Sequence, residues 1–255
     1  MTTQAYFLVA HGSRSPHPKA ALQSLADFVA TTAQDDSVSA IGTGFLEFQP
    51  LSLAEQLLKF QASLPASCTQ IIVIPVFLLP GHHVLSDIPD EIKIAQARLA
   101  KRHSPTQFLL TSHVGSQPAI EQILRLKMES LSPDAWILLG HGSRRSAGNQ
   151  AIRQLANKIQ AAPAFWAVEP SLSIQVQYAL NTGATSIGII PYFLFSGKIT
   201  ETIAQHVKAL ATQYSDQSLT LLSPLEPTLP LAAAILELAH LTTLDYSAAS
   251  MARVS

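Results

Sequence analysis

One tetrapeptide, His-Gly-Ser-Arg, occurs twice in this 255-residue chain, at residues 11–14 and again at residues 141–144. Each copy follows a short apolar run. Further matches follow in the same order, and their offset shrinks from 130 to 120, 116 and 112, as expected if the second copy has shorter loops. They pair Phe45–Pro50 with Phe165–Pro170, Thr69–Gly81 with Thr185–Gly197, and Leu109–Thr111 with Leu221–Ser223. The sequence therefore predicts a duplicated domain, and this repeat constrains the fold more than any other feature.

Within the first repeat, short apolar runs alternate with segments of helical period. The run Ile71–Ile74 is β-branched throughout, which is typical of a strand buried on both faces of a parallel sheet. The alternation predicts an α/β fold in which each repeat is a four-stranded parallel sheet with helices on both faces. The expected strands are Tyr6–Ala10, Ile41–Phe48, Ile71–Leu79 and Gln107–Ser112; the expected helices are Pro16–Val29, Leu51–Leu64, Asp90–Arg102 and a segment from Pro118.

A Ser-Pro-Asp segment at residues 132–134 interrupts the pattern between the two repeats. We interpret it as a linker, which places the first domain at residues 1–131 and the second at residues 135–245.

Composition excludes several classes of function. The net charge is −1 and no run of Lys or Arg stands out, which disfavours nucleic acid as a partner. Cys68 is the single cysteine, so an internal disulfide and a cysteine-ligated iron–sulfur cluster are both excluded. Pro75 and Pro80 interrupt the longest apolar stretch, and the N-terminus has no basic leader. We expect a soluble cytoplasmic protein without a membrane partner.

The repeat also separates scaffold from added chemistry. His11 has a counterpart in His141, so part of the tetrapeptide's role could be to cap the following helix. Three other versatile side chains of the first repeat have no such counterpart. They are Glu47, His82 and His83, which stand opposite Ala167, Lys198 and Ile199.

These side chains follow predicted strands, whose carboxyl ends line one crevice in a doubly wound sheet. Imidazole and carboxylate groups that converge there suit a divalent metal, acid–base work or both. The alternative is that the His82–His83 pair is polar loop sequence. His113 ends another predicted strand and could line the same crevice, whereas His103, His206 and His240 are expected to be surface or packing residues.

The segments that carry these residues resemble the sirohydrochlorin chelatases, class II chelatases that insert iron or cobalt into a modified tetrapyrrole. The resemblance rests on Val-Ala-His-Gly-Ser-Arg, on Phe-Leu-Glu before a proline, and on Pro-Val-Phe-Leu-Leu-Pro-Gly-His-His-Val-Leu-Ser-Asp-Ile-Pro. It extends through the Pro-Tyr-Phe-Leu-Phe-Ser-Gly segment of the second repeat. It implies two chelatase-like domains in a monomer that mimics the homodimer of single-domain relatives.

The resemblance also implies a set of site residues. His11 and His83 correspond to the metal-binding histidines, and Glu47 to a carboxylate that faces the tetrapyrrole; the three together would be catalytic. The substrate-binding candidates are Ser13, Arg14, Glu47, Leu78, Leu79, Pro80, Gly81 and His82. His82 ranks after His83 as the main ligand. The second repeat departs from the pattern at Ala167 and Ile199, so we expect it to support the first repeat without a working site of its own.

The resemblance implies sirohydrochlorin and divalent iron or cobalt as substrates, with no permanently bound cofactor, in sirohaem or cobalamin biosynthesis. Imidazole, with an unperturbed pKa of about 6.5, can bind metal or accept a proton near neutral pH. The sequence does not choose between iron and cobalt. Two alternatives remain: a tetrapyrrole or metal carrier without turnover, and a phosphate-handling enzyme with a histidine nucleophile. For the second alternative, the sequence lacks a glycine-rich phosphate loop.

Overall fold

The structure is a computed structural model that describes residues 3–33, 38–144 and 146–252. The chain forms two compact units. Unit 1 contains the chain up to Gln117 together with the C-terminal segment from Pro227, and unit 2 runs from Pro118 to Glu226.

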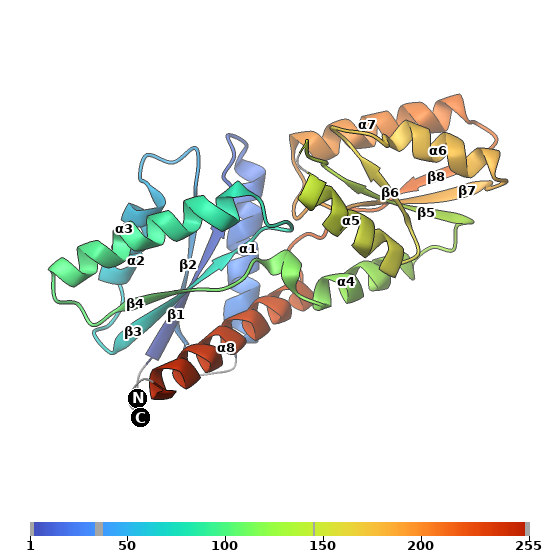
Figure 1. Ribbon diagram of the computed structural model, residues 1–255. Helices are drawn as coiled ribbons and strands as arrows, with labels where there is room; N and C mark the ends of the chain where they lie inside the picture. Colours follow the sequence, from blue (N-terminus) through green and yellow to red (C-terminus); the bar gives the residue numbers. More distant parts are fainter. Residues whose placement is uncertain (1–2, 34–37, 145, 253–255) are drawn as a thin grey trace. The chain divides into compact units, whose positions relative to one another are not determined.

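Unit 1 is a four-stranded parallel sheet with the strand order β2-β1-β3-β4. Helices α2 and α3 pack together, as do helices α1 and α8 (Figure 1). In chain order its elements are β1 (Thr3–Ala10), α1 (Pro16–Thr32), β2 (Val38–Phe45), α2 (Leu53–Ala62), β3 (Cys68–Pro75), the π-helical turn η1 (His83–Asp87), α3 (Ile88–Lys101), β4 (Gln107–Leu110), the 3₁₀ turn η2 (Val114–Ser116) and α8 (Leu229–Ala252).

Unit 2 repeats the arrangement, with parallel strands in the order β6-β5-β7-β8. Its elements are α4 (Ala119–Met128), β5 (Ala135–Gly140), α5 (Ser146–Lys158), β6 (Ala162–Phe165), α6 (Leu172–Asn181), β7 (Ser186–Pro191), α7 (Lys198–Gln213) and β8 (Ser218–Leu221). Two parallel sheets of the same order confirm the predicted duplicated α/β fold.

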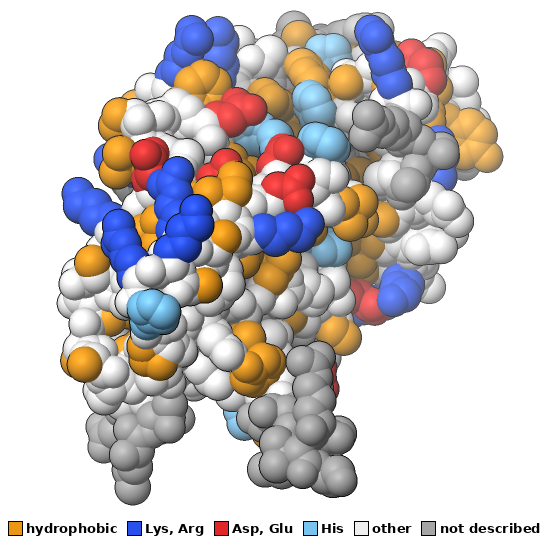
Figure 2. Space-filling view, turned by 60° about the vertical axis from the view of Figure 1, so that its left-hand side comes forward, with side chains coloured by type: hydrophobic (Ala, Val, Ile, Leu, Met, Phe, Trp, Pro, Cys, Tyr) orange, Lys and Arg blue, Asp and Glu red, His pale blue; other side chains and the backbone are white. Residues whose placement is uncertain are grey.

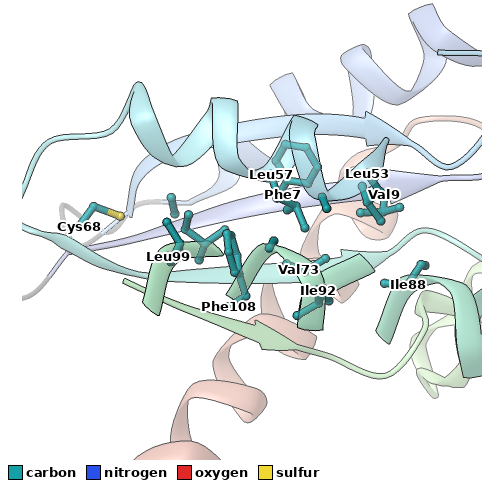
Figure 3. Close-up of a cluster of buried hydrophobic side chains, with 14 residues drawn as sticks. Phe7, Val9, Leu53, Leu57, Cys68, Val73, Ile88, Ile92, Leu99 and Phe108 are labelled. Atoms are coloured by element: carbon teal, nitrogen blue, oxygen red, sulfur yellow. The ribbon is translucent and has the colours of Figure 1, made fainter. Parts of the chain in front are cut away.

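The core of unit 1 explains why these segments form these elements. Successive strand residues point to opposite faces, and on one face of the sheet Phe7, Val9 and Val73 pack against Leu57 of α2 and Ile92 of α3. Figure 3 shows this cluster. The alternate strand residues Leu8, Ile72 and Ile74 are equally buried. Both faces of the strands are apolar because helices cover both.

Three predicted strands end earlier than the sequence suggested, and the shortest difference is at β4, which ends at Leu110 instead of Ser112. β2 ends at Phe45, and Phe48 has a φ of 58°, a left-handed conformation that no extended strand can contain. β3 ends at Pro75, where Phe77 N–H turns back to donate to the Pro75 carbonyl. Glu47 therefore lies in a loop after its strand, and the Leu78–Gly81 segment is loop as well.

The last helix of each repeat lies in the unit formed mainly by the other repeat. Helix α4 belongs by sequence to the first repeat and by contacts to unit 2, while α8 belongs by sequence to the second repeat and by contacts to unit 1. Helix α8 packs on α1 and on the strands β3 and β4 (Figure 1). The sequence repeats and the compact units thus differ by an exchange of helices.

Among the described helices, none combines the length and the apolar character needed to cross a membrane.

Candidate metal centre

The strand order of unit 1 brings three loops to one edge of the sheet. β1 pairs with β2 on one side and with β3 on the other, so successive strands are added to opposite sides of β1, and the strand order switches between β1 and β3. Ligands of open α/β sheets bind at such a point, outside the carboxyl ends of the strands. His11 directly follows β1, Glu47 follows β2, and His83 lies beyond the end of β3.

A glycine allows the loops after β1 and β2 to touch. Glu47 N–H donates to the His11 carbonyl over 2.9 Å. Gly12 has a φ of 102°, and a Cβ there would lie 2.3 Å from the Glu47 carbonyl oxygen. Any other residue at this position would have a strained backbone, and its Cβ would clash with the backbone of Glu47. Gly12 therefore lets the backbone of the loop after β1 approach the backbone at Glu47 closely.

His11, Glu47 and His83 form one cluster. Each offers a ligand atom, and these atoms all lie within 4.8 Å of one another. His11 Nδ1 is 3.9 Å from Glu47 Oε2, and the His11 and His83 rings meet edge to face with centroids 4.6 Å apart. Two imidazoles and a carboxylate are suitable ligands for a divalent transition metal.

The cluster is open to solvent on one side. The His11 and Glu47 side chains are both nearly half exposed, and His83 lies deeper, with the Phe77 ring 6.2 Å from its own. In the space-filling view, histidine and acidic side chains lie beside one another at the surface, with hydrophobic side chains between them (Figure 2). Each of the three side chains is therefore at least partly accessible to solvent.

Asp87, which was not among the predicted site residues, is a polar neighbour of the cluster. Its Oδ2 is 2.6 Å from His83 Nδ1, and its Oδ1 is 3.4 Å from His82 Nε2. Residues four apart on a helix share a face, so the spacing of His83 and Asp87 was a signal available in the sequence. His82 lies outside the three-residue cluster and its side chain is 64% exposed, against 31% for His83.

The predicted substrate-binding residues of the first loop lie beside the cluster in sequence but make local contacts. Ser13 Oγ accepts a hydrogen bond from Ser15 N–H within the turn that precedes α1. The Arg14 guanidinium lies 5.3 Å from the centroid of the Phe48 ring, a cation–π arrangement. Phe48 is half exposed and was not predicted as a site residue.

The loop Leu78–Gly81 packs against the loop after β4. Gly115 N–H donates to the Phe77 carbonyl, and a Cβ at Gly115 would overlap Leu78 backbone. His113 lies in this second loop, directly before η2, and burial lowers its pKa. His113 does not join the cluster of His11 with its two partners.

Unit 2 repeats the backbone of the site but keeps only His141 of the three side chains, with Ala167 and Ile199 opposite Glu47 and His83. Ala167 N–H donates to the His141 carbonyl over 2.8 Å, and Gly142 has a φ of 80°. The methyl group of Ala167 stands where unit 1 has the Glu47 carboxylate. In the part of the chain that the structure describes, the cluster of unit 1 is the one group of three or more potential metal ligands.

Fold and site together define a duplicated α/β protein with one His–Glu–His cluster at the topological switch point of its first sheet. The model of the CbiX family matches the chain twice, at residues 5–131 and 135–240. The chain therefore belongs to the CbiX family.

Named relatives agree with this assignment. A sirohydrochlorin ferrochelatase of Priestia megaterium is 25% identical over 82% of this chain and 79% of its own, and a sirohydrochlorin cobaltochelatase of the same organism is 23% identical over 84% and 71%. The solved structure "SirB from Bacillus subtilis with Fe3+" superposes with a TM-score of 0.73 at 25% identity, covering 96% of this chain and 98% of that one.

Proposed function

We propose that this protein is a sirohydrochlorin chelatase, which inserts a divalent iron or cobalt ion into sirohydrochlorin. The observation that carries the proposal is the convergence of His11, Glu47 and His83 in a chain of the CbiX family. Relatives of both iron and cobalt specificity are similar to the chain, so both ions remain candidates.

The chemistry of insertion explains why such a cluster is needed. The incoming ion forms bonds to four pyrrole nitrogens, and two N–H bonds of the macrocycle break, so two protons must leave. His11 and His83 deliver the ion through ring nitrogens and accept protons as the ion passes to the macrocycle. Glu47, 3.9 Å from His11, stabilises the positive charge on the ion or on the protonated ring.

The surrounding loops would hold the macrocycle and its carboxylates. Arg14 offers a cation to a substrate carboxylate, and Ser13 and His82 offer hydrogen bonds. The Leu78–Gly81 loop offers apolar contact to the ring. The half-exposed Phe48, which already stacks under Arg14, adds an aromatic surface on the same side.

The test is metal insertion followed by the change in the visible spectrum of sirohydrochlorin, with Fe²⁺ under anaerobic conditions and with Co²⁺. Substituting His83→Ala or His11→Ala removes a ligand and a proton acceptor, so we expect each to lower kcat/KM by about 100-fold or more. His141→Ala is the matched control: unit 2 has Ala167 in place of the carboxylate, so this variant should insert metal at the wild-type rate.

Two outcomes would contradict the proposal. Undiminished insertion by His83→Ala would remove the assignment of the cluster. Stoichiometric binding of metal and tetrapyrrole, with no rate above that of the free reactants, would favour a carrier instead.

We further propose that the chain acts as a cytoplasmic monomer, with the first repeat, residues 1–131, supplying the site residues and the second, residues 135–245, completing the fold. The exchange of α4 and α8 supports the part of this proposal that concerns the second repeat, because each compact unit is built from both repeats. Mass measurement in solution would test the monomer.

A further inference from the structure

Asp87 lies between two imidazoles. Its Oδ2 atom lies 2.6 Å from His83 Nδ1, and its Oδ1 atom lies 3.4 Å from His82 Nε2. The shorter distance is that of a strong, charge-assisted hydrogen bond, and the longer one is a looser contact. The stronger interaction of Asp87 is therefore the one with His83, the less exposed of the two histidines.

The backbone holds this pair in place. His83 and Asp87 are the first and last residues of the π-helical turn η1, whose wider winding is closed by a hydrogen bond from Ile88 N–H to the His83 carbonyl. Val84 and Ile88 anchor the turn, because both side chains are buried in unit 1. The carboxylate is thus fixed relative to the imidazole by a packed element rather than by a free loop.

An imidazole that donates Nδ1–H to a carboxylate has one defined tautomer. Its Nε2 then carries the lone pair, and the hydrogen bond increases the basicity of that nitrogen. Histidine ligands of metal sites commonly have such a carboxylate partner, and its loss typically weakens metal binding by about 10- to 100-fold.

We propose that Asp87 is the positioning residue of His83: it holds Nδ1–H and so turns the Nε2 lone pair of His83 toward the metal shared with His11 and Glu47. The inference rests on the proposed function, because it assigns Asp87 a part in delivering the metal substrate. Asp87 itself does not touch the ion.

Binding of Co²⁺ alone to the full-length protein, followed by visible absorption, tests this role without turnover. Asp87→Ala should raise the Kd for Co²⁺ by about 10- to 100-fold and change the cobalt absorption bands. Asp87→Asn should have a smaller effect, because its amide oxygen still accepts Nδ1–H without the charge. Asp90→Ala is the matched control: it removes an exposed carboxylate that pairs with Lys93, three residues further along, and should leave the Kd unchanged.

The same substitution in a His83→Ala background separates positioning from general support of the fold. Since Asp87 acts through His83, Asp87→Ala should not weaken cobalt binding further once His83 is gone. A merely structural carboxylate would weaken the remaining His11–Glu47 site in both backgrounds, and that result would overturn the inference.

The proposed function and the inference fail in different ways. If the wild-type chain binds Co²⁺ and the Asp87→Ala variant binds it with the same Kd, the inference is wrong and the proposed function stands. A wild-type chain that bound neither Co²⁺ nor Fe²⁺ would overturn the proposed function and the inference with it.

Discussion

Asp134 shows how one exposed residue can tie two strands together. Its Oδ2 accepts hydrogen bonds from the backbone N–H and the hydroxyl groups of both Thr185 and Ser186, over 2.8 to 3.0 Å. These donors stabilise the carboxylate and lower the pKa of Asp134 from 3.8 to about 2. Asp134 directly precedes β5, and its partners lie at the start of β7. The end of the segment expected to be a linker is therefore hydrogen-bonded within unit 2.

Because the folded state holds the pKa of Asp134 below its unfolded value, the carboxylate stabilises unit 2 fully above pH 3.8, and this contribution is lost as the pH falls toward 2. We expect Asp134→Ala to lower the melting temperature of unit 2 at pH 5 to 7, and the difference from wild type to narrow below about pH 4. Tryptophan fluorescence measures this, since Trp136 and Trp166 both lie in unit 2. A difference that stayed constant with pH would show that the charge is not involved.

At the scale of elements, glutamines on helices close the edges of the sheets. Gln56 of α2 accepts from Phe45 N–H and donates to the Phe45 carbonyl on the edge strand β2, and Gln96 of α3 does the same for Phe108 N–H and the Thr106 carbonyl beside β4. Edge strands with free backbone groups invite pairing with other chains. Gln56 also donates to the Leu51 carbonyl, so it braces the loop that carries Glu47.

Gln96→Leu keeps the volume of the side chain but leaves the Phe108 N–H and the Thr106 carbonyl without this partner. We expect it to destabilise unit 1 by about 1–3 kcal/mol and to increase self-association through β4. Urea unfolding and light scattering would measure the two effects. Ala97→Leu, at the next position of α3, is the control for added apolar surface, because Ala97 is exposed. Equal self-association of the two variants would show that apolar surface, and not the open strand edge, is the cause.

The sequence predicted the order of the elements because buried parallel strands and amphipathic helices leave strong apolar patterns. It also predicted that His11, Glu47 and His83 would lie together, since each follows a strand of one parallel sheet; the repeat added that Glu47 and His83 have no counterpart in the second copy. The equivalent hydrogen bonds of Glu47 to His11 and of Ala167 to His141 confirm that alignment of the repeats. The left-handed Phe48 and the π-helical winding of η1 were not predicted, because both depend on packing that no local pattern encodes, although the four-residue spacing of His83 and Asp87 is visible in the sequence.

At the scale of the whole molecule, the exchanged helices mean that neither repeat can form its unit alone. Unit 1 contains the site residues of the first repeat but completes one face of its sheet with α8, whose Leu231, Ile235 and Leu238 are buried. Burying three such side chains contributes roughly 5–9 kcal/mol, which is comparable to the whole stability of a typical domain. The two repeats therefore depend on one another, and a fragment that contained the first repeat alone would lack α8 of the unit that carries the cluster.

Point substitutions in two helices distinguish this arrangement from one in which each repeat folds by itself. Ile235 in α8 and Ile203 in α7 both belong by sequence to the second repeat, and both are fully buried. Changing either to alanine should cost about 2–5 kcal/mol through lost contacts and a cavity. We expect Ile235→Ala to reduce amide-exchange protection in β1 and β3 of unit 1, and Ile203→Ala to shift the tryptophan-detected unfolding of unit 2. If Ile235→Ala instead lowered protection in β5 and β7 and left β1 and β3 unchanged, α8 would belong to its own repeat.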